Sequence, residues 1–235
     1  MTLLYDQPRY RLSGDRALLV EYGDGIDPAV NEKVRIITAF LKKRLPEGVE
    51  AVVPAYRSLS LIYNPLKTAP AVLASLLDTL ERDLCATEIP EARVVSIPVC
   101  YGGAFGPDME VVANHTRFDA DRIAAIHASV DYPIYMIGFT PGFCYLGGLD
   151  RRLWTPRKKT PRTSLPAGAV GIAESQTGMY PIESPGGWQI IGRTPLRLFA
   201  PARESPFLYE PGDRIRFAPI GEDEFHRLRK REEGS

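Results

Sequence analysis

The residues best suited to bind a small polar ligand lie in the second half of the chain, on segments rich in glycine and proline. Residues 166–181 and 183–195 place amide, hydroxyl, guanidinium and aromatic groups on turn-rich backbone. Such a set can hydrogen-bond a small amide or carboxylate while an aromatic ring excludes water. Turn chemistry alone could also explain the glycines and Pro185. The candidate residues are Gln176, Thr177, Tyr180, Ser184, Trp188 and Arg193.

A second candidate segment, residues 135–149, alternates aromatic residues with glycines and includes Phe139 and Phe143. Glycine allows backbone to come close to a ligand or to a neighbouring strand. The segment therefore forms either the wall of a binding pocket or the corner of a barrel whose aromatic residues fill the core. Composition alone favours the barrel corner.

The third candidate is a basic segment, Thr155–Arg162, which carries four cations and two prolines. Proline holds the backbone extended, which limits the entropy lost when the cations meet an anion. Arg157 and Arg162 can each bind a carboxylate or a phosphate through two parallel hydrogen bonds. The alternative is a solvated basic loop, which is the usual state of a run of charges.

Several common sites are absent from the sequence. There is no G-x-x-x-x-G-K-[ST] phosphate loop, no dinucleotide fingerprint and no G-x-S-x-G nucleophile elbow. The histidines and cysteines lack metal-ligand spacing, so no metal is predicted. Cys144 is expected to be a partly buried, inert thiol rather than a nucleophile. The histidines are His115, His127 and His226, and the cysteines are Cys85, Cys100 and Cys144.

Charge and hydropathy exclude further classes of function. The chain has 29 basic and 29 acidic residues, so its formal net charge is zero. A neutral chain has no overall field to hold nucleic acid or an anionic membrane. No apolar run is long enough to cross a bilayer, and the first residues do not resemble a signal peptide. Free cysteines and the missing signal predict a cytoplasmic protein.

Two domains are expected to position these segments, one over residues 1–90 and one over residues 91–235. Sixteen of the 20 glycines follow residue 90, which indicates a turn-rich, mainly β second half. The first half reads as an α+β domain of the split-βαβ type. Its predicted elements are a strand at 16–22, a helix capped by Asp27, a hairpin of strands at 49–53 and 58–63, and a helix whose buried face holds Val72, Leu73, Leu76, Leu77, Leu80 and Leu84. A strand near Val94 is a candidate to close this domain.

The second half is expected to form a barrel or a sandwich, because short strands follow one another between turns. Two short helices precede most of them, near 108–114 and 119–128, with Asp119 as the N-cap of the second. The acidic residues of this pair would repel DNA phosphates. The predicted strands are 94–99, 134–139, 169–173, 188–192, 196–199 and 214–217.

Several motifs in fixed order resemble the KipI-like family, also known as the 5-oxoprolinase B-subunit family or as allophanate hydrolase subunit 1. They run from about residue 97 to residue 217 and include Y-M-I-G-F-T-P-G-F-C-Y-L-G-G-L at 135–149, Q-T-G at 176–178, S-P-G-G-W at 184–188 and I-G-R-T-P at 191–195. The resemblance implies a cyclophilin-like β-barrel for the second domain. It also implies two partners, a KipA-like C subunit together with a LamB/YcsF-type A subunit. ATP is implied at the level of that complex, which opens the lactam of 5-oxoproline to give glutamate.

The resemblance implies three candidate functions. In a 5-oxoprolinase, Arg162, Gln176 and Arg193 are the candidate catalytic residues, because a cation can stabilise the anion formed when ATP activates the amide oxygen. Phe139, Phe143, Thr177, Tyr180, Ser184 and Trp188 are the candidate substrate-binding residues. The alternatives are a carboxyltransferase component of a urea-carboxylase-like enzyme and an inhibitor of a sporulation histidine kinase.

Overall fold

The computed structural model describes residues 3–83 and 92–234 of the 235-residue chain. The chain divides into two compact units, residues 1–91 and 92–235, and each unit has its own hydrophobic core. The predicted boundary after residue 90 lies outside the described residues, as do Leu84 and Cys85.

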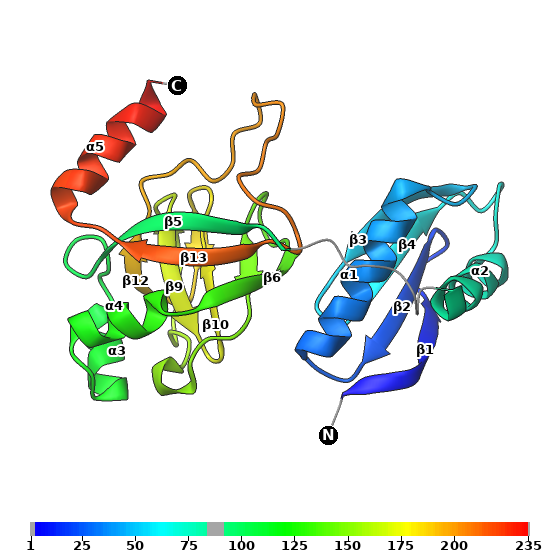
Figure 1. Cartoon of the computed structure of the whole chain (residues 1–235), viewed down its shortest axis with the longest axis horizontal. Coiled ribbons are helices and arrows are strands. Elements are labelled where there is room, and N and C mark those ends of the chain that lie inside the picture. Colours follow the sequence, from blue (N-terminus) through cyan, green and yellow to red (C-terminus); the bar gives the residue numbers. More distant parts are fainter. Residues whose placement is uncertain (1–2, 84–91, 235) are drawn as a thin grey trace. The chain divides into compact units, whose positions relative to one another are not determined.

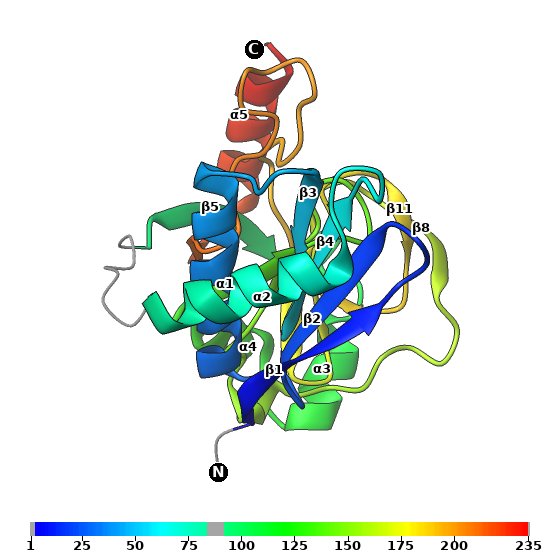
Figure 2. The ribbon, with the colours of Figure 1, turned by 90° about the vertical axis from the view of Figure 1, so that its right-hand side faces the viewer.

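The first unit is a four-stranded antiparallel sheet in the order β1-β2-β4-β3, with two helices packed on one of its faces (Figure 2). Alternate residues of β2 and β4 point toward the helices, as the twofold repeat of a strand requires. The elements are β1 (Leu4–Leu12), β2 (Ala17–Gly23), α1 (Pro28–Lys43), β3 (Val49–Pro54), β4 (Ser58–Tyr63) and α2 (Pro70–Asp83).

The predicted N-cap of α1 is confirmed, because the Asp27 carboxylate accepts hydrogen bonds from the N–H groups of Ala29 and Val30. The predicted buried face of α2 is too wide. Val72 and Leu76 are 59% and 38% exposed, whereas the stripe that contacts the sheet contains Leu73, Leu77 and Leu80. One face of this sheet is shared by two helices, so each helix buries only a narrow stripe.

Strand β1 was not predicted from the sequence. It contains Pro8, and proline in a run of residues argues against a central strand. In the structure β1 is an edge strand that pairs only with β2, and its pairing is irregular between Leu4 and Arg9. Proline is tolerated there because the N–H that it lacks has no partner strand to reach.

The second unit is a closed barrel of seven strands in the order β10-β7-β6-β13-β5-β12-β9, which confirms the predicted barrel (Figure 1). All neighbouring strands are antiparallel except β13 and β5. A separate two-stranded sheet pairs β8 with β11. The strands are β5 (Val94–Tyr101), β6 (Asp131–Ile137), β7 (Cys144–Leu146), β8 (Arg162–Leu165), β9 (Ala169–Ala173), β10 (Gln176–Met179), β11 (Ser184–Gly186), β12 (Gln189–Arg193) and β13 (Arg214–Pro219).

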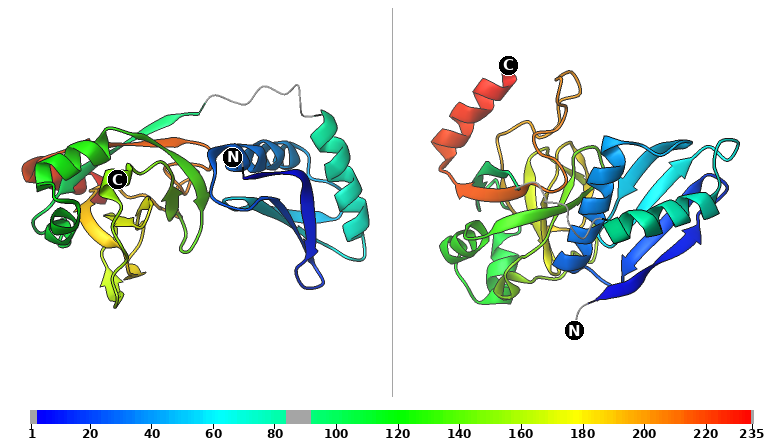
Figure 3. Two further views of the ribbon diagram at one scale, coloured as in Figure 1. Left: turned by 90° about the horizontal axis from the view of Figure 1, so that it is seen from below. Right: turned by 45° about the vertical axis from the view of Figure 1, so that its right-hand side comes forward.

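The two predicted short helices are confirmed as α3 (Met109–Thr116) and α4 (Ala120–Ala128), and Asp119 caps α4 through the N–H of Arg122. A short 3-10 helix, η2 (Arg151–Leu153), precedes the basic segment. After β13 the charged tail forms α5 (Glu222–Glu233), which leads away from the barrel (Figures 1 and 3). No helix among the described residues is both long and apolar enough to span a bilayer.

Two strand predictions are wrong. The strand at Val94 belongs to the barrel, where it pairs with β12 and β13, and does not close the first unit. Residues 196–199 form no strand, and only an isolated bridge joins Phe199 to Phe207. Prolines at 195, 201 and 206 flank this stretch and remove backbone donors that a ladder would need.

Candidate functional site

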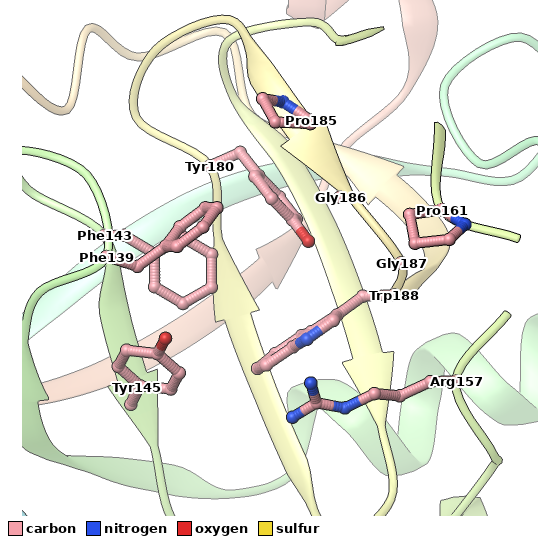
Figure 4. Close-up of a pocket in the computed structure, with 10 residues that line it drawn as sticks. All are labelled: Phe139, Phe143, Tyr145, Arg157, Pro161, Tyr180, Pro185, Gly186, Gly187 and Trp188. Carbon is pink, nitrogen blue, oxygen red and sulfur yellow. The ribbon is translucent and has the colours of Figure 1, made fainter. Parts of the chain in front are cut away.

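An aromatic pocket of about 280 Å³ lies on the outer surface of the barrel (Figure 4). It is lined by residues from the loop before β7, from β7, from the β10–β11 connection, from β11 and the residues between β11 and β12, and from the basic segment. The lining residues are Phe139, Phe143, Tyr145, Arg157, Pro161, Tyr180, Pro185, Gly186, Gly187 and Trp188.

Small residues on the outer face of β9 and β10 make room for this pocket. Strand β9 directs Val170 and Ile172 into the barrel core and Ala169 and Ala173 into the outer aromatic cluster. A Cβ on Gly178 would lie 2.8 Å from the carbonyl oxygen of Cys144 and 3.1 Å from the Trp188 ring. The aromatic rings can therefore pack flat against β9 and β10 only where these strands have glycine or alanine on their outer face.

Phe143 is the centre of the aromatic cluster. Its ring meets Tyr145, Tyr180, Trp188 and Phe139 edge to face, with centroid separations of 4.8, 5.0, 5.5 and 5.5 Å. Edge-to-face contacts of this kind add stability beyond that of the buried area. The backbone N–H of Trp188 also hydrogen-bonds the hydroxyl of Tyr180, and burial raises the pKa of Tyr180 to about 12. The pocket walls are thus rigid before any ligand arrives.

The basic segment crosses the barrel surface beside the pocket and is fixed along its backbone. The N–H of Lys158 donates to the carbonyl of Gly187 at 2.8 Å, and the side-chain amide of Gln189 donates to the carbonyl of Pro156 at 2.9 Å. Thr155 forms a bridge with Glu174 at the tip of the β9–β10 turn. Arg157 lies between these anchors, and its guanidinium carbon stands 5.9 Å from the centroid of the Trp188 ring.

Asp108, just before α3, binds the side chains of the basic segment. Its buried carboxylate accepts two hydrogen bonds from Arg162, at 2.7 and 2.8 Å, and one from Lys158 at 3.0 Å. The N–H of Ile190 donates to it as well, at 2.8 Å. Burial alone would raise the pKa of Asp108, but the hydrogen bonds from Arg162, Ile190 and Lys158 outweigh it and hold the pKa below its usual value.

The structure brings four of the predicted residues together in the pocket: Phe139, Phe143, Tyr180 and Trp188. Thr177 lies elsewhere. It pairs with Ile172 in the ladder, so it points into the barrel, where its hydroxyl donates to the carbonyl of Gly171 and contacts His127. Ser184 is buried on β11, and its hydroxyl has no partner among the described residues.

The three predicted catalytic residues do not line the pocket. Arg162 faces Asp108 with both terminal nitrogens. Arg193 on β12 donates through Nε to the carbonyl of Ala167 at 2.9 Å, and burial lowers its pKa. Gln176 is half-buried at the start of β10. Of the residues predicted as catalytic or substrate-binding, only the four aromatic ones therefore meet in the pocket, where Arg157 joins them.

The site prediction left out Tyr145, Pro161 and Asp108. Arg157 was predicted to bind a carboxylate or a phosphate, but it was not named among the catalytic or substrate-binding residues. Tyr145, Arg157 and Pro161 lie in segments that the sequence already marks by glycine, proline or charge. Asp108 carries no such signal, because its partners are 50 and 54 residues further along the chain. No group of three His, Cys, Asp or Glu residues in the described part of the chain is placed to hold a metal ion.

Phe139 combines an exposed ring with unfavourable backbone. Its φ is +69°, in the left-handed region that bulky residues avoid, and its side chain is 61% exposed at the pocket. Strain of this kind persists where function requires it.

We expect the free energy of unfolding of Phe139→Asn to equal that of the wild type or to exceed it by up to about 1 kcal/mol, because Asn tolerates this backbone. Its affinity for a small planar carboxylate such as benzoate, measured by calorimetry, should fall.

Arg117 gives a matched control for the strain. It ends α3 with a φ of +66°, and it is exposed and is not among the residues that line the pocket. Arg117→Gly should gain a similar amount of stability through the preference of this position for glycine, with ligand affinity unchanged. Equal ligand affinity in the Phe139→Asn variant and the wild type would show that the ring takes no part in binding.

The fold and the pocket define a protein with a closed barrel, an aromatic pocket on the outside of that barrel and a separate α+β unit. The chain belongs to the family described as carboxyltransferase domain, subdomain C and D, which matches residues 8–209. This result confirms the family that the sequence motifs indicate.

Curated relatives cover nearly the whole chain. The chain is 41% identical over 230 residues to the B subunit of 5-oxoprolinase from Bacillus subtilis, covering 93% of this chain and 96% of that protein. It is 46% identical over 195 residues to the B subunit of 5-oxoprolinase from Haemophilus influenzae, covering 83% and 91% of the two chains. A urea amidolyase of Lachancea kluyveri is 26% identical, and the match covers 93% of this chain and 14% of that much longer one.

Solved structures share the fold. TTHA0988 superimposes with a TM-score of 0.78 at 36% identity, over 87% of this chain, which spans 40% of the length of TTHA0988. The protein PH0987 of Pyrococcus horikoshii is 44% identical with a TM-score of 0.56, over 92% of this chain and all of the other.

Proposed function

We propose that the chain is the B subunit of an ATP-dependent 5-oxoprolinase, in which it acts with a KipA-like C subunit together with a LamB/YcsF-type A subunit. The observation that carries the proposal is the identity of 41–46% to relatives named as the B subunit of 5-oxoprolinase, over 91–96% of their length. The aromatic pocket supports the proposal, because ring walls beside one guanidinium suit the small amide or carboxylate that such a complex requires.

The pocket supplies binding rather than bond cleavage. Its ring walls exclude water, and its titratable lining groups are Arg157, Tyr145 and Tyr180. Burial raises the pKa of both tyrosines, so neither is poised to act as a base near neutral pH. Burial also raises the pKa of the nearby Cys144 to about 11, which keeps its thiol protonated and a poor nucleophile. Amide activation by ATP and the attack on the lactam are therefore assigned to the assembled complex.

This division of labour predicts that the purified chain alone releases no glutamate from 5-oxoproline. Mixing it with the KipA-like and LamB/YcsF-type partners should restore ATP-dependent release, which a coupled glutamate assay measures. Omitting each component in turn is the control. Turnover by the isolated chain, or full turnover by the two partners without it, would contradict the proposal.

A carboxyltransferase role is the second candidate, favoured by the relatives named urea amidolyase. Their identity is lower, and this chain matches only 14% of the length of the one compared above. Carboxyl transfer would require bicarbonate and a biotin-bearing partner. Activity of the reconstituted complex that depends on both, with no release of glutamate from 5-oxoproline, would favour this candidate over the first.

A further inference from the structure

Arg157 differs from the other cations of the basic segment in where its charge is directed. Lys158 and Arg162 both contact Asp108, and Lys159 is exposed and lies outside the pocket lining. The Arg157 guanidinium forms no ion pair with any residue in the described part of the chain. Its positive charge therefore remains available to a ligand.

The guanidinium of Arg157 points into the pocket. Figure 4 shows it beside the Trp188 ring, across from Tyr145 and Tyr180. Its charge also acts on the hydroxyls of both tyrosines, lowering their pKa values against the larger effect of burial. The carboxylate of Glu174 accepts a hydrogen bond from the backbone N–H of Arg157 at 3.5 Å and forms no ion pair with its guanidinium.

A second donor lies next to this guanidinium. Figure 4 places the indole nitrogen of Trp188 on the side of the ring that faces Arg157. Within the described residues that N–H has no hydrogen-bond partner, although Trp188 is 5% exposed. The nitrogen is not among the buried side-chain atoms that lack a partner, so a ligand in the pocket can reach it and place an acceptor atom there.

We propose that Arg157 and the indole N–H of Trp188 form an anion subsite in the aromatic pocket, which selects small planar ligands that carry a carboxylate over neutral ligands of the same shape. The subsite has one cationic donor, the guanidinium, and one neutral donor, the indole N–H. No acidic residue lines the pocket, so the pocket favours an anion. The flat walls formed by Phe143 and Trp188 favour a ring. A guanidinium already held over an aromatic face loses little freedom on binding.

The anchoring of the basic segment explains why Arg157, rather than its neighbours, has this role. The backbone contacts on either side of it, from Pro156 to Gln189 and from Lys158 to Gly187, fix where its side chain starts. Asp108 pulls the side chains of Lys158 and Arg162 away from the pocket. Alternation along an extended backbone then leaves Arg157 facing the rings. The choice of ligand rests on the proposed function, whereas the location of the subsite does not.

The test is a set of calorimetric titrations of the full chain with 5-oxoproline, with its neutral analogue 2-pyrrolidinone and with benzoate as an unrelated planar carboxylate. We expect both carboxylates to bind, and Arg157→Gln to weaken them about ten- to a hundredfold while leaving 2-pyrrolidinone unchanged. Lys159→Gln, which removes one positive charge from the same segment, should change nothing. Trp188→Phe should weaken the carboxylates several-fold and shows whether the indole N–H contributes.

The outcomes separate the subsite from the proposed function. Binding of benzoate but not 5-oxoproline, lost in Arg157→Gln, would support the subsite and contradict the lactam as its ligand. Turnover of 5-oxoproline by the full complex with an unchanged KM in Arg157→Gln would overturn the subsite and leave the function standing. Failure of every carboxylate to bind the wild-type chain, or equal weakening by Lys159→Gln, would also overturn it.

Discussion

Asp108→Ala is expected to lower the free energy of unfolding of the barrel unit by about 3 kcal/mol. The side chain of Asp108 is 3% exposed, and its loss leaves two cations and the N–H of Ile190 without their acceptor. Breaking a buried ion pair by removing one partner typically costs about 3–5 kcal/mol. The lower end applies here, because Arg162 and Lys158 are 28% and 25% exposed and can turn toward water.

Urea denaturation followed by tryptophan fluorescence measures this effect in the correct unit, because both tryptophans of the chain, Trp154 and Trp188, lie in the barrel unit. Asp131 is a matched control. It also accepts two hydrogen bonds from one arginine, from Nε and one terminal nitrogen of Arg216, but this pair lies on the surface. Asp131→Ala should cost no more than about 1 kcal/mol. Equal losses in the two variants would show that burial of Asp108 contributes nothing.

The double variant Asp108→Leu/Arg162→Met tests the cause of the loss. If an unpaired buried charge causes the destabilisation, removing Arg162 as well should recover part of it. Recovery will be incomplete, because Lys158 and the N–H of Ile190 still lack an acceptor. If the loss of unfolding free energy in the double variant equals the sum of the losses in Asp108→Leu and Arg162→Met, the cause is instead simple loss of packing.

The sequence predicted the barrel and most elements of both units because local signals and tertiary structure agree at those positions. Asp27 and Asp119 cap the helices that their spacing indicates, and strands such as β9 and β13 fall where apolar residues lie between turns. Prediction failed where context overrides the local pattern. Strand β1 was missed because Pro8 argues against a central strand, and β1 is an edge strand. Residues 196–199 are apolar enough for a strand, but they lie among prolines and form none.

The site was predicted in part for a comparable reason. Glycine beside aromatic residues marks close packing, so the sequence singled out the segments that carry Phe143 and Trp188. Composition alone favoured a barrel corner for the first segment, whereas its rings line the outer pocket. Pairing between distant residues leaves no trace in spacing, so nothing in the sequence showed that Arg162, unlike Arg157, would meet Asp108. The inward direction of Thr177 depends on its register with Ile172, which a single sequence does not reveal.

His127 is a titratable group in the core of the same barrel, away from the pocket. It is fully buried, stacked on Phe217, with Nδ1 2.7 Å from the Tyr101 hydroxyl and Nε2 2.8 Å from the Thr177 hydroxyl. Thr177 donates its single hydroxyl proton to the carbonyl of Gly171, so it must accept from His127. The network therefore assigns the proton to Nε2, and Nδ1 accepts from Tyr101. Burial favours this neutral ring and lowers the pKa of His127 to about 3.

Acid is consequently expected to destabilise the barrel through His127. An unfolded histidine titrates near 6.5, so between that pH and about 3 the unfolded chain binds a proton that the folded chain excludes. The contribution of His127 to the free energy of unfolding is fully present above pH 6.5. It falls by up to about 1.4 kcal/mol per pH unit as the pH drops, or roughly 5 kcal/mol over the whole interval.

Urea titrations at several pH values measure this dependence. The His127→Gln variant should be less stable at pH 7 but should lose this part of the dependence of stability on pH. His115→Gln, at an exposed position, should keep it. A slope that survives in His127→Gln would assign the acid sensitivity to the paired carboxylates instead, because they also lose stability as the pH falls.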